Sequence, residues 1–185
     1  MRYFLGFLFA IGMIIVVFVL ILQGFTHHTA APKNQISLLD YANSQTVVTL
    51  SVDGPVNADS LHRGYSITIG RDSVNMVTTQ GYQGSVLQQK TYANNASSYA
   101  TFLRALQLDN YTKGKTGAGI VTDERGYCAT GERYVFQIIA GGQSVERFWS
   151  TSCGGGTFQG AAASVIDLFQ KQVPDYGTLI QTVNL

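Results

Sequence analysis

A glycine-rich segment in the last third of the chain carries the residue types most capable of catalysis. Ser150, Ser152 and Cys153 come directly before three consecutive glycines. Consecutive glycines leave backbone N–H groups accessible, and these can form an anion-binding nest or an oxyanion hole. A serine beside such a loop could act as a nucleophile, with His62 as its base. One interpretation is therefore an exported hydrolase that uses residues 150–153.

The same segment lacks the features that usually accompany a serine nucleophile. It contains no G-x-S-x-G elbow, and no carboxylate is identified that would orient His62. The glycines are explained more simply by a sharp turn of the chain. We therefore assign no catalytic residue and predict a binding patch. This patch consists of Trp149, Ser150, Ser152, Gly154 and Gly155.

The residues before this segment predict a β-hairpin. Tyr134, Phe136 and Ile138 alternate with other side chains, as in a strand with one buried face. Gly141 and Gly142 then supply a two-residue turn, in which positive φ angles are tolerated. Residues 144–150 alternate again, which predicts the returning strand.

Cys128 and Cys153 are the only cysteines, and the hairpin brings them near one another. Folding about the glycine pair places residue 128 opposite about 155, and residue 153 opposite about 130. A shift of two residues would put the sulfurs within bonding distance, so we predict a disulfide. The alternatives, a cysteine nucleophile or a zinc site, lack a nearby histidine and a C-x-x-C pair. We predict no metal site.

Neither composition nor motifs indicate a nucleotide or a nucleic acid. Charged residues make up 12% of the chain and its formal net charge is +1, so no basic surface is expected. Residues 113–119 resemble a phosphate-binding loop, but Asp109 stands where the pattern G-x-x-x-x-G-K-[ST] needs its first glycine. We predict no cofactor and no nucleic-acid partner.

The remaining periodicities predict an α+β domain. Residues 46–52 are rich in β-branched side chains, residues 65–69 alternate, and residues 74–79 return after a turn, which predicts three strands. The spacing over residues 94–108 predicts a helix with Tyr99, Phe102, Leu103 and Leu106 on one face. The hairpin about Gly141 and a helix over 160–173 follow. We expect a two-layer domain of antiparallel β-hairpins with two packed helices, in the order strand–strand–helix twice and with an extra strand in front.

Residues 3–22 are apolar throughout and contain no charged side chain. A helix of this length spans the roughly 30 Å hydrocarbon core of a bilayer, and a core helix would show a polar face. The segment is longer than the apolar part of a signal peptide, which favours retention over cleavage. A pilin-type stem would carry an acidic residue where this chain has Ile11.

Arg2 precedes the span and no acidic residue occurs before Asp40, which predicts a cytoplasmic N-terminus. We expect a single-pass protein of the cell membrane with its C-terminal domain outside. The predicted divisions are 1–24 for the cytoplasmic tip and transmembrane helix, 25–45 for a linker, and 46–185 for the extracytoplasmic domain. The lipid bilayer is the expected partner of residues 3–22.

The last third of the chain resembles uncharacterised membrane-anchored exported proteins of bacteria with small genomes. The resemblance rests on residues 127–134, on 149–153, on 156–158, and on Leu168-Phe169 before Pro174. It implies the same topology and no particular activity.

These patterns favour a binding or interaction module over an enzyme. Tyrosines are plentiful, and they combine apolar area with a polar tip, which suits carbohydrate or protein recognition, although alternation places several of them in the core. They include Tyr65, Tyr82, Tyr92, Tyr99, Tyr111, Tyr127, Tyr134 and Tyr176. An envelope component or another protein is the expected partner, and the hydrolase is the alternative.

Overall fold

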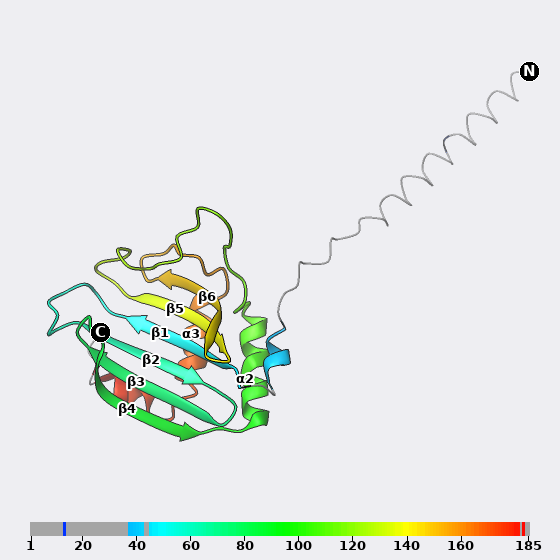
Figure 1. Cartoon of the computed structure of the whole chain (residues 1–185), viewed down its shortest axis with the longest axis horizontal. Coiled ribbons are helices and arrows are strands. Elements are labelled where there is room, and N and C mark those ends of the chain that lie inside the picture. Colours follow the sequence, from blue (N-terminus) through cyan, green and yellow to red (C-terminus); the bar gives the residue numbers. More distant parts are fainter. Residues whose placement is uncertain (1–12, 14–36, 43–44, 182, 184–185) are drawn as a thin grey trace, which may run out of the picture. The chain divides into compact units, whose positions relative to one another are not determined.

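The computed structural model describes Met13 and residues 37–42, 45–181 and 183. Its main element is a six-stranded antiparallel sheet with the strand order β4-β3-β2-β1-β5-β6 (Figure 1). The strands are β1 (Val47–Asp53), β2 (Arg63–Ile69), β3 (Ser73–Gln80), β4 (Ser85–Ala93), β5 (Arg133–Ala140) and β6 (Gln143–Thr151). β1 therefore lies near the centre of the sheet and pairs with β2 and β5, which are far apart in the sequence.

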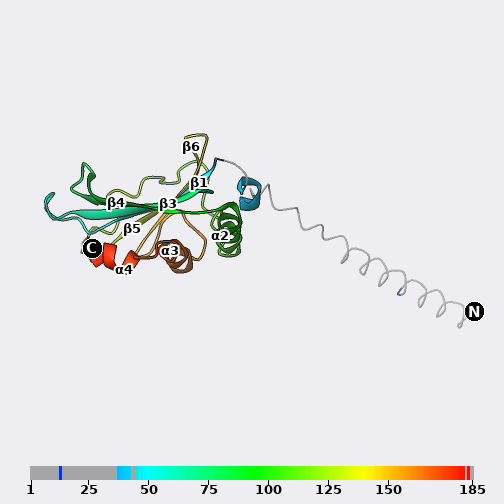
Figure 2. The same cartoon turned by 90° about the horizontal axis from the view of Figure 1, so that it is seen from below.

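The α-helices lie on one face of this sheet, and a short 3-10 helix lies at its margin beside the first of them (Figure 2). They are the 3-10 helix η1 (Leu38–Tyr41) and the α-helices α2 (Ala96–Leu108), α3 (Ala162–Gln170) and α4 (Tyr176–Gln181). Asn95 caps α2 by accepting a hydrogen bond from the Ser98 N–H group at 2.9 Å. The described part of the compact unit therefore forms two layers, one of strands and one of helices.

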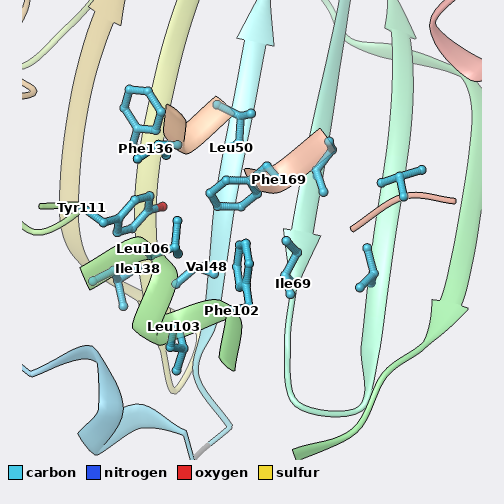
Figure 3. Packing of buried hydrophobic residues seen from close by; sticks show 14 of the residues in the cluster. Val48, Leu50, Ile69, Phe102, Leu103, Leu106, Tyr111, Phe136, Ile138 and Phe169 are labelled. Carbon is cyan, nitrogen blue, oxygen red and sulfur yellow. The ribbon is translucent and has the colours of Figure 1, made fainter. Parts of the chain in front are cut away.

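The hydrophobic core fills the space between the two layers (Figure 3). Alternate residues of the strands, such as Leu50 and Phe136, face Phe102 on α2 and Phe169 on α3. Tyr111 is buried among them, with its hydroxyl 2.9 Å from the Gln137 carbonyl oxygen and 3.1 Å from that of Thr49. Burial raises the pKa of Tyr111 well above its usual range, so the hydroxyl remains a donor.

The predicted α+β class and the antiparallel hairpins are confirmed, but the predicted element order is not. β4 was not expected, so four strands precede α2, and α4 follows α3 as an additional helix. β4 is an edge strand whose side chains are mostly exposed, and neighbouring Val86 and Leu87 are both exposed. Its alternation of apolar and polar residues is weak for this reason.

The predicted transmembrane segment falls, except for Met13, outside the described residues. Among the helices that are described, none has the length and apolar character needed to cross a bilayer. The compact unit that contains the sheet extends over Ile36–Leu185. Leu38 of η1 is buried in its core, so part of the predicted linker packs into this unit.

The last helix is attached to the edge strand through Asp175, which directly precedes α4. Lys90 and Tyr92 of β4 each bond one of its carboxylate oxygens. These bonds, led by that of Lys90, lower the pKa of Asp175 from its ordinary value of 3.8. A carboxylate with a lowered folded-state pKa stabilises the fold above its unfolded-state pKa, and this stabilisation is lost as the pH falls toward the folded-state pKa.

We therefore expect an Asp175→Asn variant to lose less stability than the wild type as the pH falls from about 5 to 3. Urea unfolding at several pH values measures this difference. Asp72→Asn, which removes an exposed carboxylate of the loop between β2 and β3, is the control. Equal acid sensitivity of wild type and Asp175→Asn would contradict the assignment.

Candidate binding site

The sheet has an open face, on which no helix of the described residues lies (Figure 2). Side chains alternate along strands, so residues next to the core residues point to this face. Strand pairing aligns Ser51 of β1 with Ser66 of β2 and Val135 of β5. Two residues further along β1, on the same face, Asp53 aligns with Gly64 and Arg133. Two serines, Val135 and one ion pair therefore occupy the centre of the open face.

A cleft of about 610 Å³ lies over this region. Its floor includes Ser51, Ser66 and Thr79, and its ends are formed by His62 and Tyr82 on one side and by Glu124, Arg125 and Gly126 on the other. The walls thus come from the β1–β2 loop, the β3–β4 turn and the segment before β5. A rigid sheet with loops at its margin is a common way to build a ligand site.

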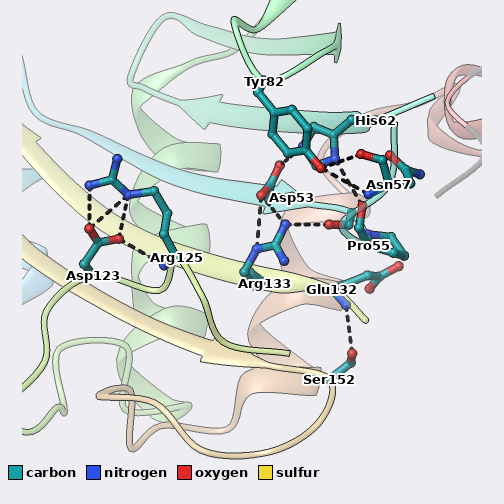
Figure 4. Close-up of polar contacts among 11 residues, drawn as sticks. Asp53, Pro55, Asn57, His62, Tyr82, Asp123, Arg125, Glu132, Arg133 and Ser152 are labelled. Atoms are coloured by element: carbon teal, nitrogen blue, oxygen red, sulfur yellow. Dashed lines mark hydrogen bonds and ion pairs between the residues drawn. The ribbon is translucent and has the colours of Figure 1, made fainter. Parts of the chain in front are cut away.

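Asp53 is the centre of the charged groups in the cleft (Figure 4). Its Oδ1 accepts a hydrogen bond from His62 Nε2 at 2.6 Å, and its Oδ2 accepts one from Arg133 Nε at 3.1 Å. Arg133 Nη2 bonds the same oxygen and also donates to the Gly54 carbonyl oxygen at 2.6 Å. The Arg133 side chain is only 3% exposed, whereas that of Asp53 is 46% exposed. The pair therefore neutralises a buried guanidinium group.

Both ring nitrogens of His62 are occupied by acceptors. Nδ1 lies 3.1 Å from the Pro55 carbonyl oxygen, which can only accept, and Nε2 faces the Asp53 carboxylate. Each ring nitrogen therefore faces an acceptor of the protein, and neither is left free to face a substrate. His62 thus holds the β1–β2 loop in place and is not arranged as a general base.

Tyr82 covers the other side of the histidine. The two rings stack with centroids 4.1 Å apart and an angle of 16° between their planes. The Tyr82 hydroxyl donates to the Asn57 carbonyl oxygen at 2.8 Å and accepts from the Asn57 N–H group at 3.1 Å. Its own N–H group donates to Asp59 at 2.8 Å. The ring is thereby fixed in orientation although the residue is 51% exposed.

The opposite wall is anchored on β6. Trp149 donates from Nε1 to the Val121 carbonyl oxygen at 2.9 Å, and its ring contacts Tyr127 at a centroid distance of 4.8 Å. Arg147 pairs with Glu124 at 2.5 Å and also donates to the Thr122 carbonyl oxygen. These contacts hold the segment 121–127 against the open face.

A disulfide joins Cys128 to Cys153 at the end of this wall, as the hairpin spacing predicted, with the two Cα atoms 5.6 Å apart. The turn lies at Gly141 and Gly142, between the paired residues Ala140 and Gln143. An irregularity after Ile138 then shifts the register by one residue, so that Arg133 lies opposite Thr151. This bulge moves residue 128 further from residue 153 in register, so it does not supply the predicted shift. The cysteines meet because the chain turns after each strand end, where the Gly131 N–H group bonds the Cys128 carbonyl oxygen and the Gly154 N–H group bonds that of Thr151.

The structure does not assemble the predicted binding patch into one surface. Trp149 and Ser150 are buried on opposite faces of the sheet, whereas Ser152, Gly154 and Gly155 are exposed. Ser152 Oγ accepts a hydrogen bond from the Glu132 N–H group at 2.9 Å. None of these five residues lines the cleft. The proposed nucleophiles are therefore not placed with His62, whose acidic partner is Asp53.

Sequence reasoning missed the two residues at the centre of the cleft. Gly54 and Pro55 directly follow Asp53, and this combination is typical of a turn, so the sequence does not single out its carboxylate. Arginine side chains are mostly exposed, and exposed charges contribute little to stability, but the side chain of Arg133 is buried. The only signal in the sequence was position: Asp53 ends one strand and Arg133 begins another, and each is next to a residue of the predicted core. Their partnership depends on strands β1 and β5, which are paired only in the tertiary structure.

Among the described residues, no group of three or more histidine, cysteine, aspartate or glutamate side chains is arranged to hold a metal ion. Comparison of the sequence with known proteins finds no matching family model and no matching curated relative. The functional argument therefore rests on the geometry of the cleft.

Proposed function

We propose that this chain is a single-pass membrane protein that presents its α+β domain outside the cell as a binding module. The proposed anchor is residues 3–22, and the proposed ligand site is the cleft on the open face. The ligand would be an envelope component or another protein. The single observation that carries the binding role is the set of fixed polar groups in the cleft, in which His62 has no nitrogen left for catalysis.

The geometry supports binding because the cleft is built before a ligand arrives. Its floor belongs to strands in the middle of the sheet, and its loops are held by the contacts of Asp53, Tyr82 and Trp149. A preformed site does not have to order loops and side chains when it binds, which favours affinity. The hydrolase alternative gains no support, since its serines lie away from the cleft.

The proposed topology is tested by labelling single cysteines in intact cells with a membrane-impermeant maleimide. Leu108→Cys introduces a thiol at the end of α2, where the native side chain is 83% exposed. We expect this thiol to react from outside. Arg2→Cys is the matched control and should react only after the membrane is permeabilised. The reverse pattern would overturn the proposed orientation.

The proposed ligand site is tested with a photo-crosslinking amino acid in the full chain in intact membranes. Val56 lines the cleft and is 55% exposed, so a crosslinker there reaches a bound ligand. The same group at Leu108 lies outside the cleft and is the control. We expect an adduct that forms at position 56 and not at 108. Identical behaviour of the two positions would contradict the proposed site.

A further inference from the structure

We propose that the cleft on the open face binds a neutral carbohydrate chain. This inference rests on the proposed function, since it names the ligand class of the same site. It follows from three properties of the cleft: a fixed aromatic ring, a floor of hydroxyl groups, and charges that are already paired.

The aromatic ring is that of Tyr82. One of its faces stacks on His62, and its hydroxyl already makes both a donated and an accepted hydrogen bond with Asn57 (Figure 4). The polar tip is therefore engaged within the protein, and what the exposed residue offers to a ligand is its free ring face. The negative face of an aromatic ring attracts the polarised C–H groups on one side of a sugar ring. Because the ring is already fixed, such stacking costs little side-chain entropy.

The floor of the cleft supplies short hydroxyl groups. Ser51, Ser66 and Thr79 line the cleft from three adjacent strands, and each hydroxyl can donate and accept. Gly64 lies between Asp53 and Thr79 of the two neighbouring strands and has no side chain to obstruct the floor. A Cβ atom at this position would be 2.9 Å from the Val52 carbonyl oxygen and 3.3 Å from Thr79 Oγ1. This arrangement suits a ligand that carries many hydroxyl groups of its own.

The charges in the cleft are neutralised by partners within the domain. The pairs are Asp53 with His62 and Arg133, Arg125 with Asp123, and Glu124 with Arg147. A charged ligand would thus have to compete with an existing ion pair, whereas a neutral ligand can hydrogen-bond to the outer lone pairs of Asp53, which is 46% exposed. A neutral sugar chain matches this pattern better than an acidic sugar or a charged peptide.

The proposal is tested by isothermal titration of the full chain in nanodiscs with fully N-acetylated chitohexaose and cellohexaose as neutral probes. Oligogalacturonate serves as the acidic sugar probe, and a random decapeptide pool represents peptides. Co-sedimentation with insoluble chitin and cellulose distinguishes a polymer ligand from free oligosaccharides. We expect at least one neutral hexasaccharide to bind with a Kd below about 1 mM and oligogalacturonate to bind more weakly.

Variants distinguish a loss of stacking on Tyr82 from a loss of the fold as the cause of weaker sugar binding. Tyr82→Ala should weaken sugar binding about tenfold or more, whereas Tyr82→Phe, which keeps the ring, should retain it within about threefold. Ser66→Trp fills the floor and should abolish binding, and Leu108→Ala, outside the cleft, should leave binding unchanged. Circular dichroism verifies that each variant is folded.

Two outcomes would overturn the proposal in distinguishable ways. If no neutral sugar binds at about 10 mM but peptides bind and Ser66→Trp abolishes that binding, the carbohydrate assignment is wrong and the cleft remains a binding site. If sugar binding survives both Tyr82→Ala and Ser66→Trp in folded protein, the ligand lies elsewhere. Failure of the crosslinking at position 56 in addition would overturn the proposed function itself.

Discussion

Asp53→Ala should lower the free energy of unfolding by about 3 kcal/mol, because it leaves the buried Arg133 guanidinium without its counter-ion. The aspartate also accepts the hydrogen bond of His62, so the same substitution releases the β1–β2 loop. Urea denaturation followed by circular dichroism measures the loss. Removing one partner of a buried pair is costly since the remaining charge is neither hydrated nor paired.

The matched control is Asp123→Ala, which breaks the other aspartate–arginine pair of the cleft. Arg125 has a side chain that is 84% exposed, so water replaces the lost contact there. We expect this variant to be much closer to wild type than Asp53→Ala. The double variant Asp53→Ala/Arg133→Met should recover part of the lost stability, because it removes the buried charge as well. Equal losses in Asp53→Ala and Asp123→Ala would show that Arg133 does not depend on Asp53.

Removing the disulfide should lower the free energy of unfolding by about 3.5 kcal/mol. The estimate follows from the chain entropy of a loop that closes over a sequence separation of 25 residues. The double variant Cys128→Ser/Cys153→Ser should have this lower stability with or without a reducing agent, whereas the wild type should reach it only when reduced. Alkylation of the wild type should require prior reduction.

The disulfide also fixes one wall of the cleft, since Cys128 directly follows the segment 121–127. We expect faster amide hydrogen exchange in this segment in the double serine variant, with β1 and β2 unchanged. Stability that does not respond to reduction, or exchange that accelerates uniformly over the sheet, would contradict this role.

The spacing of apolar residues predicted those helices and strands that bury one face and expose the other. The helix over 96–108 buries the four residues that its periodicity indicated, namely Tyr99, Phe102, Leu103 and Leu106. The glycine pair at 141 and 142 set the position of the hairpin turn, and through it the approach of the two cysteines. In these cases the side chains that define the element are close in the sequence, so their spacing contains the necessary information.

Exposed or long-range features could not be predicted in the same way. β4 is held at the sheet edge by pairing with β3 more than by a buried face of its own, so its composition does not identify it as a strand. The predicted patch around Trp149 was assembled from sequence neighbours. In a strand, however, neighbours point to opposite faces, so Trp149 and Ser150 could not share one surface.

The sequence by itself determined the α+β class, the hairpin, the cysteine pair and the apolar segment at residues 3–22. Each depends on residue type and spacing over a short stretch of chain. Only the tertiary structure decided what lies in the cleft. Asp53 meets Arg133 across 80 positions because β1 pairs with β5, and Tyr82 meets His62 because the β3–β4 turn lies beside the β1–β2 loop. Contacts of this kind depend on strand order, which local spacing does not encode.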